Sequence, residues 1–386
     1  MTVQFDYLSA THIVFGWGHL SQLTHLVKPY GDRVFVVTGK NKRRAYSIEK
    51  YLRELNVTYQ VFSVGGEPTV DLVENALMEA RAFRTQLVIG FGGGSVLDTG
   101  KALAAMLAND GEVTDYLEVA GKGLPLTNPS IPYIAIPTTS GTGTEVTRNA
   151  VLSVPEKGIK VSMRSNLMLP KIALVDPKLT LSMSSEVTAS TGLDALTQVM
   201  EAFVSNKANP MVDMLCREGM KRASLSLEKA WCDGHNRKAR TDMSFLALLS
   251  GLALANGGLG AVHGFAGPLG GMISAPHGTI CASLLPWVME QNIGVIEQQE
   301  DLHEILERYD EVAQILTQNH QANRYDGVKW VRNLCQKMNI PTLNQLGFQS
   351  QQTDELILKS AQSSSMRGNP VVLTKGNMEQ ILFNAM

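Results

Sequence analysis

Apolar positions in the first half of the chain fall into short runs rich in β-branched residues. Between these runs lie segments whose apolar residues are three and four positions apart. The short runs predict β-strands, and the intervening segments predict amphipathic helices. Strands and helices that alternate in this way are typical of a parallel sheet covered by helices. The expected strands are Arg33–Thr38, Tyr59–Val64, Gln86–Gly90 and Tyr133–Ile136, and the expected helices are Ala45–Leu55, Thr69–Ala82 and Val96–Leu107.

From about Ser184 the pattern changes, because β-branched runs become rare and helical spacing continues over long stretches. The predicted fold class is therefore α/β, with an N-terminal parallel-sheet domain and a C-terminal all-helical domain. Pro177 and the stretch 179–185 have linker chemistry, so we place the domains at residues 1–182 and 183–386. The helices expected in the second domain are Ser185–Ser205, Met211–Trp231, Arg237–Ala255, His277–Gln291 and Glu311–Met338.

Composition narrows the class of protein. The chain has 386 residues, of which 44% are hydrophobic, and this excludes a disordered chain and a small disulfide-stapled scaffold. The formal net charge is −2, so no basic excess points to nucleic acid. The four cysteines form no CxxC pair, and we expect reduced thiols in a cytoplasmic protein. Neither a signal peptide nor a membrane-spanning run of about 18 apolar residues is expected.

Glycine is enriched, at about 9% of the chain against an average near 7%, and the glycines cluster. Gly92, Gly93 and Gly94 lie between a predicted strand and a predicted helix, and Ser95 follows them. Glycines allow the backbone to approach a phosphate group, and a helix N-terminus offers free N–H donors. Ser95 is expected to cap the helix or to donate to a phosphate. An ordinary turn is the alternative, since neither GxGxxG nor a Walker pattern is present.

A second loop of the same kind follows the predicted strand Tyr133–Ile136. Residues 137–145 are rich in hydroxyl groups and glycine, with no bulky side chain before Glu145. Two such loops at the carboxyl ends of parallel strands converge where α/β sheets bind ligands. We therefore expect a dinucleotide or another phosphate-bearing ligand, with a flexible Ser/Thr/Gly loop as the alternative.

The end of the first predicted strand bears on the identity of this ligand. An acidic residue at that position typically binds the ribose 2′-hydroxyl of NAD, whereas basic residues accommodate the 2′-phosphate of NADP. Here the strand ends at Gly39, and Lys40, Lys42, Arg43 and Arg44 follow. The sequence favours NADP(H) over NAD(H), with a solvated basic helix start as the alternative.

Two of the eight histidines, His263 and His277, lie among glycines and apolar residues. A buried neutral imidazole needs partners, and a metal ion is one way to supply them; a structural role is the alternative, and the more common one for a pair of histidines alone. Asp194 and Gln198 are four residues apart on a largely apolar predicted helix, so they share one face. An inward Asp with no nearby Lys or Arg needs a cation or hydrogen-bond donors.

Six motifs follow one another along the chain: GGGSVLDTGKA (Gly92–Ala102), IPTTSGTGTEVT (Ile136–Thr147), LVDPKLT (Leu174–Thr180), STGLDALT (Ser190–Thr197), GLGAVHGFAGPLGG (Gly258–Gly271) and APHG (Ala275–Gly278). In this order they resemble the iron-containing (group III) alcohol dehydrogenase family, and the resemblance covers essentially the whole chain, down to Asn369-Pro370. It implies an N-terminal Rossmann-like, dinucleotide-binding domain and a C-terminal helical, metal-binding domain, with the active site between them.

The family's metal ion sits on one Asp and three His, and the resemblance carries the Asp to Asp194 and two His to His263 and His277. The third His falls at Gln198, and a further family His near the nicotinamide falls at Gly267. An amide oxygen is a weaker ligand than imidazole for Fe²⁺ or Zn²⁺. The outcomes left open are ligation by Gln198, replacement by water, and a metal-poor site; we expect a retained, weaker site. The cofactor contacts implied by the resemblance are Gly93, Gly94, Ser95, Asp98, Thr138, Thr139, Thr142, Val151, Lys160 and Leu179.

The implied activity is that of a metal-dependent NAD(P)-linked alcohol dehydrogenase or aldehyde reductase. Hydride would pass between an alcohol carbon and C4 of the nicotinamide, with one divalent metal ion, Fe²⁺ or Zn²⁺, as Lewis acid at Asp194, His263 and His277. A small alcohol or aldehyde is the expected partner, and the family's usual dimers suggest a homodimer. The alternatives are a nucleotide-binding relative with a degraded metal site and a dehydroquinate-synthase-like lyase.

Overall fold

The computed structural model describes residues 4–386, apart from the side chains of residues 42–44. Contacts divide the chain into two compact units. The α/β unit contains residues 8–139 and 143–181, and the helical unit contains residues 4–7, 140–142 and 182–386.

The α/β unit is built on a six-stranded sheet in which every strand pair is parallel. Its strand order is β1-β8-β5-β4-β2-β3, and a separate antiparallel pair, β6 and β7, completes the unit. This confirms the parallel sheet expected from the alternating pattern. The strands are β1 (His12–Phe15), β2 (Arg33–Gly39), β3 (Thr58–Val64), β4 (Leu87–Gly92), β5 (Tyr133–Pro137), β6 (Asn149–Val154), β7 (Ile159–Arg164) and β8 (Ile172–Val175).

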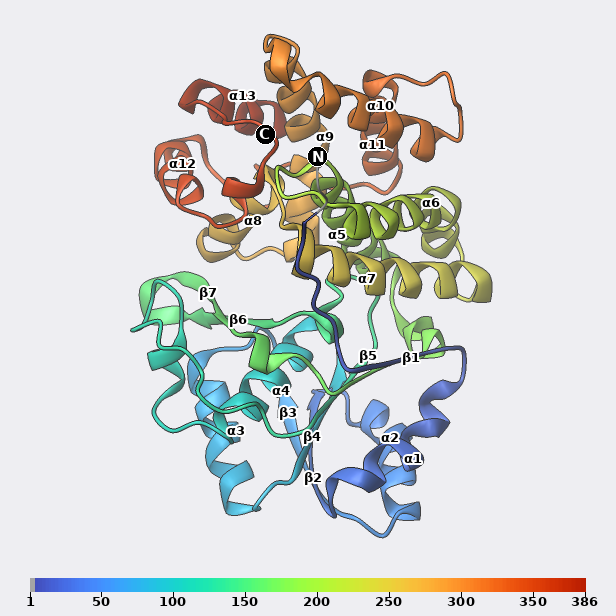
Figure 1. The fold of residues 1–386 in the computed structure, drawn as a ribbon, viewed down its shortest axis with the longest axis vertical. Helices are drawn as coiled ribbons and strands as arrows, with labels where there is room; N and C mark the ends of the chain where they lie inside the picture. Colours follow the sequence, from blue (N-terminus) through green and yellow to red (C-terminus); the bar gives the residue numbers. More distant parts are fainter. Residues whose placement is uncertain (1–3) are drawn as a thin grey trace. The chain divides into compact units, whose positions relative to one another are not determined.

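Both faces of the sheet are buried because the central strands are apolar at consecutive positions. On β2, Val34 and Val36 belong to one hydrophobic cluster, whereas Phe35 and Val37 belong to another. The first cluster includes residues of the helices α1 (Leu23–Val27) and α2 (Lys42–Glu54), and the second includes residues of α3 (Val70–Ala82) and α4 (Gly94–Met106). Figure 1 shows these two pairs of helices on opposite faces of the sheet.

The order of the strands places a switch point between β2 and β4. The chain leaves β2 for β3 on one side, and it leaves β4 for β5 on the other side. In open α/β sheets, ligands bind outside the carboxyl ends of the strands at such a point. Here those ends are Gly39 and Gly92, where the sequence analysis expects a nucleotide.

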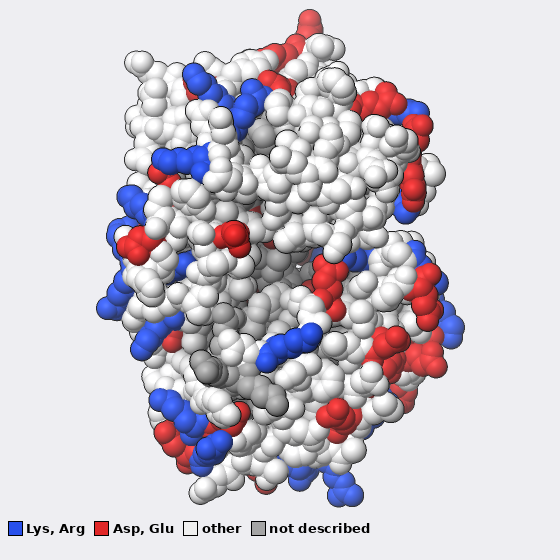
Figure 2. Space-filling view, turned by 180° about the vertical axis from the view of Figure 1, so that it is seen from behind, with Lys and Arg blue, Asp and Glu red and all other residues white. Residues whose placement is uncertain are grey.

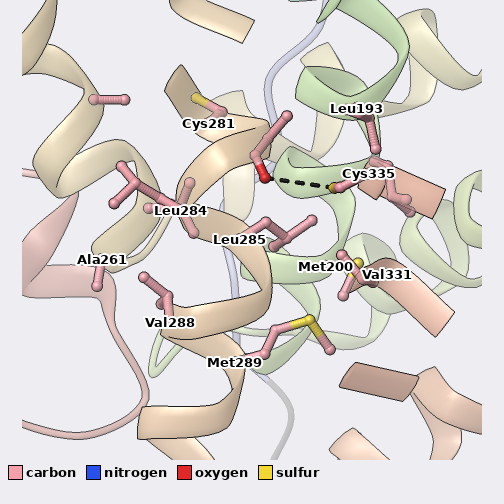
Figure 3. Close-up of a cluster of buried hydrophobic side chains, with 14 of the residues drawn as sticks. Leu193, Met200, Ala261, Cys281, Leu284, Leu285, Val288, Met289, Val331 and Cys335 are labelled. Carbon is pink, nitrogen blue, oxygen red and sulfur yellow. Dashed lines mark hydrogen bonds between the residues drawn. The ribbon is translucent and has the colours of Figure 1, made fainter. Parts of the chain in front are cut away.

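The helical unit packs its helices around one large apolar core, part of which is drawn in Figure 3. Buried residues of α5, α8, α9 and α11 meet in this core. The helices are α5 (Ser185–Val204), α6 (Pro210–Cys232), α7 (Arg237–Gly257), α8 (Ala261–Met272), α9 (His277–Ile296), α10 (His303–Thr317), α11 (Arg324–Lys337), α12 (Thr353–Ala361) and α13 (Lys375–Ala385).

One predicted helix, Glu311–Met338, is wrong. The chain forms two helices there, because α10 ends at Thr317 and the next residue, Gln318, has a left-handed backbone with φ of 56°. A capping box between Asn323 and Asp326 then begins α11. Short strands such as β1 and β8 and the glycine-rich helix α8 are further elements that the pattern did not predict.

The surface carries charges of both signs. Figure 2 shows Lys and Arg side chains interspersed with Asp and Glu side chains on the face that it presents. Within residues 4–386, no single helix is long and apolar enough to cross a membrane. Only α7 and α8 taken together, with a bend of 100°, meet the length and composition criteria.

Candidate functional site

The turn after β4 forms a helix N-terminus open to a ligand. Gly93 is the N-cap of α4, and no side chain caps this helix. The prediction that Ser95 caps the helix is therefore wrong. Gly94 and Ser95 form the first turn and are partly exposed. Uncapped N–H groups and the helix dipole make this end suited to a phosphate group.

The loop after β5 lies beside this turn. The backbone N–H of Thr138 donates to the Gly92 carbonyl at 2.8 Å. A Cβ on Gly93 would lie 3.3 Å from the Thr139 hydroxyl, so the two loops are closely packed. The Thr138 hydroxyl is buried and has no hydrogen-bond partner among the described residues. A buried donor without a partner is costly, and a polar ligand atom would satisfy it.

Lys101 ties the second loop to α4. Its ammonium group donates to the Thr144 carbonyl at 2.7 Å, to the Thr147 hydroxyl at 2.9 Å and to the Asn149 carbonyl at 2.8 Å. Burial lowers the pKa of Lys101 to about 8, against the opposing charges of Asp98 and Glu145. Lys101 therefore fixes the segment that connects the hydroxyl-rich loop to β6.

Asp98 works on the same segment. One carboxylate oxygen accepts the Thr144 hydroxyl, and the other accepts the Val151 N–H at 3.1 Å. Both contacts join α4 to the loop and to β6. The position of Asp98 is thus explained by loop anchoring, and its expected contact with a cofactor stays a prediction.

The other expected cofactor residues are spread along the same unit. A Cβ on Gly39 would meet no atom within 4 Å, so open space lies beyond the end of β2. Lys160 pairs with Glu67 at 2.5 Å, Val151 is exposed, and Leu179 is half-buried. Thr142 is exposed, in the short segment that groups with the helical unit. Of the four cations after Gly39, those at 42–44 lie outside the described side chains.

The helical unit holds the expected metal cluster. Asp194 lies on α5, His263 on α8, and His277 at the start of α9. One ligand atom from each of them, together with Cys281 Sγ, lies within 4.8 Å of the others. The structure thus brings together residues 69 and 14 positions apart in the sequence.

The separations fit a common ion. Asp194 Oδ1 lies 3.3 Å from His263 Nε2 and 3.9 Å from His277 Nε2. A tetrahedron of ligands about 2.0–2.3 Å from a metal has edges of about 3.3–3.8 Å. The His277 side chain is 39% exposed, which leaves the cluster accessible at that residue.

Unpaired atoms in the cluster support the same conclusion. Asp194 Oδ1, His263 Nε2 and Gln198 Oε1 are buried and have no hydrogen-bond partner among the described residues. Asp194 Oδ1 and His263 Nε2 lie 3.3 Å apart, and Gln198 is one helical turn from Asp194. This concentration is unusual, because buried polar groups are nearly always paired. A divalent cation would satisfy acceptors of this type, so the residues present fit the metal implied by the family.

His263 is held from behind by a carboxylate that the sequence analysis missed. Glu201 Oε2 lies 2.6 Å from His263 Nδ1, and Glu201 Oε1 accepts the Val262 N–H at 2.6 Å. A carboxylate on one ring nitrogen orients the other nitrogen toward a metal. Asp194, Gln198 and Glu201 are spaced i, i+4 and i+7 on α5, and this spacing is the signal that could have found Glu201.

Gly278 allows α9 to approach α5. A Cβ at Gly278 would lie 2.3 Å from the Ser190 carbonyl oxygen and 3.0 Å from Asp194 Cβ. No other residue fits there without moving one helix. By contrast, a Cβ at Gly267 would meet nothing within 4 Å, so the absence of the family's His at that position is not a steric requirement.

The charges around Asp194 and His263 stabilise a positive charge placed inside the cluster. Burial raises the pKa of Asp194, but His263 and His277 outweigh burial and hold it below its usual value. Burial lowers the pKa of His263, but Cys281, Glu201 and Asp194 raise it well above its usual value. Groups that stabilise an added proton in this way also stabilise a metal cation.

Comparisons with known protein families match both the N-terminal and the C-terminal part of the chain. Residues 10–177 match the family described as iron-containing alcohol dehydrogenase, and residues 188–386 match the Fe-containing alcohol dehydrogenase family, C-terminal. A long-chain-alcohol dehydrogenase 1 from Geobacillus thermodenitrificans is 40% identical over 293 residues, which is 73% of each chain.

Solved structures agree with this match. A 1,3-propanediol oxidoreductase is 28% identical and superimposes with a TM-score of 0.92 over 99% of this chain and 100% of that one. A sulfoacetaldehyde reductase from Bifidobacterium kashiwanohense in complex with NAD⁺ is 25% identical, with a TM-score of 0.87 over 100% of this chain and 99% of that one.

Proposed function

Since the chain belongs to the iron-containing alcohol dehydrogenase family and is an oxidoreductase that acts on alcohols, we propose that Asp194, His263 and His277 form its metal-dependent catalytic centre. The reaction is the reversible conversion of an alcohol into its aldehyde with NAD(P). The observation that carries the proposal is the buried cluster, in which a carboxylate oxygen and an imidazole nitrogen lie 3.3 Å apart and neither makes a hydrogen bond.

Asp194, His263 and His277 would hold the metal ion, with Gln198 one turn from Asp194 on α5. The ion, Fe²⁺ or Zn²⁺, supplies Lewis acidity toward the alcohol or aldehyde oxygen when it is bound. Glu201 keeps His263 in the orientation that presents Nε2, and Gly278 keeps α9 close to α5. The partial exposure of His277 leaves a side from which a small substrate reaches the cluster.

The cofactor would be held by the loops of the α/β unit. NAD(P) supplies the hydride acceptor or donor, and the protein supplies its orientation. Gly93, Gly94 and Ser95 at the start of α4 would bind the pyrophosphate, and the unpaired Thr138 hydroxyl would donate to it. Asp98 and Lys101 hold the neighbouring loop in shape. The residues proposed to complete the contacts are Gly39, Thr139, Thr142, Val151, Lys160 and Leu179.

The choice between NADPH and NADH is the finer part of this proposal. Gly39 offers no carboxylate for a ribose hydroxyl, and cations follow it in the sequence. The related sulfoacetaldehyde reductase is described in complex with NAD⁺, so the family does not decide the matter. We propose NADPH for this chain, together with a homodimeric state; the cytoplasmic location stays a prediction.

The experiment that tests the catalytic centre combines metal analysis with turnover. Protein purified without chelators should contain about one divalent ion per chain and should oxidise NADPH with at least one member of an aldehyde panel. The panel should include short, long-chain and hydroxylated aldehydes, because the relatives are named for different alcohols. Absence of metal together with absence of turnover on every carbonyl would contradict the proposal.

The cofactor preference is tested by comparing kcat/KM for NADPH and NADH in the wild type and in Gly39→Asp. The open space at Gly39 accommodates the new side chain. The carboxylate should repel the 2′-phosphate and accept the ribose hydroxyl, shifting the ratio toward NADH by about tenfold or more. A wild type that prefers NADH would refute the role given to Gly39.

A further inference from the structure

Cys281 is the member of the metal cluster that the family pattern does not include. It lies on α9, one turn after His277, and Figure 3 shows it on this helix beside the core residues. Its Sγ is 3.6 Å from His277 Nε2. Because residues four apart share a helix face, Cys281 reaches the same place as His277 from one turn further along the helix.

We propose that Cys281 is a thiolate ligand of the metal ion and takes the place that a third histidine has in the family. This inference rests on the proposed function, since it concerns the same metal. The family's set of one Asp and three His lacks one imidazole here, at Gln198. Cys281 restores the family's number of four protein ligands, Asp194, His263, His277 and Cys281, and the substrate oxygen would add as a fifth ligand.

The distances support a sulfur ligand. A nitrogen about 2.0–2.1 Å and a sulfur about 2.3 Å from a tetrahedral metal are roughly 3.6 Å apart. The observed separation of the two atoms is 3.6 Å. No other thiol competes, because within the described residues Cys281 is the one cysteine in a group of potential metal ligands.

The other cysteines have surroundings of a different kind. Cys335 is buried in the core and donates to the Ala282 carbonyl at 3.5 Å, as the dashed line in Figure 3 shows. Cys216 is buried on α6, and burial raises its pKa. Cys232 is exposed at the end of α6. Cys281, in contrast, lies next to buried Asp194 and His263 atoms that have no hydrogen-bond partner.

A thiolate changes which metal the site prefers. Sulfur is a softer donor than imidazole or an amide oxygen. It therefore favours Zn²⁺ over hard ions such as Mg²⁺ and Mn²⁺. When the sulfur–metal bond forms, the thiol proton leaves to solvent, so no oxidant or reductant is needed. Because Zn²⁺ also stands above Fe²⁺ in the Irving–Williams order of affinities, the chain should bind Zn²⁺ in preference to Fe²⁺.

Cobalt(II) provides a readout that does not depend on activity. Metal-free protein, prepared with a chelator under reducing conditions and reloaded with Co²⁺, should show near-ultraviolet absorption from sulfur-to-cobalt charge transfer. Cys281→Ser should lose this band and bind Zn²⁺ at least about tenfold more weakly. Tenfold is the lower end of the loss caused by removing a residue that only supports a ligand, so loss of a ligand itself should cost at least as much. Cys216→Ser, the matched buried control, should keep both.

Two additional variants make the result decisive. A chain with Cys216, Cys232 and Cys335 all replaced by Ser should retain the band, which tests Cys281 even if Cys281→Ser fails to fold. Gln198→Ala should weaken Zn²⁺ binding less than Cys281→Ser does. Bound cobalt without the band, or a band that persists in folded Cys281→Ser, would overturn this inference alone. Failure of the wild type to bind any divalent ion would overturn the proposed function with it.

Discussion

The two regions that we propose as ligand-binding sites are built by different means. In the α/β unit, two loops next to each other offer backbone groups, glycines and hydroxyls at the ends of β4 and β5. In the helical unit, side chains from α5, α8 and α9 meet in one buried cluster. The first region is continuous over short stretches of sequence, whereas the second depends on the packing of distant helices. Substitutions should therefore separate the two regions cleanly.

The largest effect is expected from Asp194→Asn. The change keeps the shape of the side chain but removes the charge that faces His263 and His277. Lewis-acid catalysis is worth several kcal/mol, so kcat/KM should fall by about a thousandfold or more. Metal content should fall with it, while NADPH binding, measured by fluorescence, should be unchanged. A variant that loses cofactor binding equally would break the separation between the regions.

Lys101→Met should act on the opposite region. It removes the cation from Thr144, Thr147 and Asn149 and leaves Asp98 and Glu145 without their buried counter-charge. Removing a buried charge while the opposite buried charges near it remain costs about 3–5 kcal/mol. Urea unfolding should show this loss, and NADPH should bind more weakly. The metal content of the folded fraction should equal that of the wild type; a loss of metal would contradict the assignment of Lys101 to the cofactor loop.

Glu201→Gln tests how strongly metal binding depends on the carboxylate that holds His263 in place. The amide cannot act as a carboxylate toward both His263 Nδ1 and the Val262 N–H. Loss of such a partner typically weakens metal binding by about 10–100-fold. Competition with a chelator measures the change. Glu228→Gln, which alters an exposed ion pair with Lys337 in the same unit, is the control and should bind metal normally.

The smallest expected effect is a pH dependence of stability in the α/β unit. Burial raises the pKa of Glu145 from 4.5 to about 7, so the folded state holds this proton more tightly than the unfolded chain does. The resulting stability is complete below about pH 4.5 and is lost as the pH rises through 7. Glu145→Gln removes this term. Its unfolding free energy relative to wild type should rise by about 2 kcal/mol between pH 5 and pH 7.5. A difference independent of pH would show that Glu145 titrates normally.

The contrast between local loops and packed distant helices also explains which features could be predicted from the sequence. The sheet and both phosphate loops follow from local patterns, because strand period, glycine content and hydroxyl content are all properties of short segments. Asp194, His263 and His277 were recognised individually by their apolar surroundings and by the resemblance to a family. Their mutual distances depend on tertiary packing, which no local pattern contains.

The sequence analysis missed some residues of the site for the same reason: their role depends on tertiary packing. Glu201 and Cys281 are unremarkable in sequence, since the helices α5 and α9 carry several other polar residues. Their spacing from Asp194 and His277 places them on the same helix faces, but this becomes informative only once those faces are known to meet. Lys101 was missed because a lysine is ordinarily a surface residue, and here it is 1% exposed. The predicted helix over Glu311–Met338 failed where Gln318 adopts a left-handed conformation, which apolar spacing does not report.

The wide spacing of the cluster in the sequence also governs when the chain can capture its ion. Asp194, His263 and His277 come from three separate helices, and Gly278 must already lie against Ser190 for α9 to reach Asp194. An unfolded chain therefore offers no such site, and the free energy of metal binding is added only to the folded state. If the cluster holds the ion as proposed, chains made when the ion is scarce should be less stable and more exposed to proteolysis.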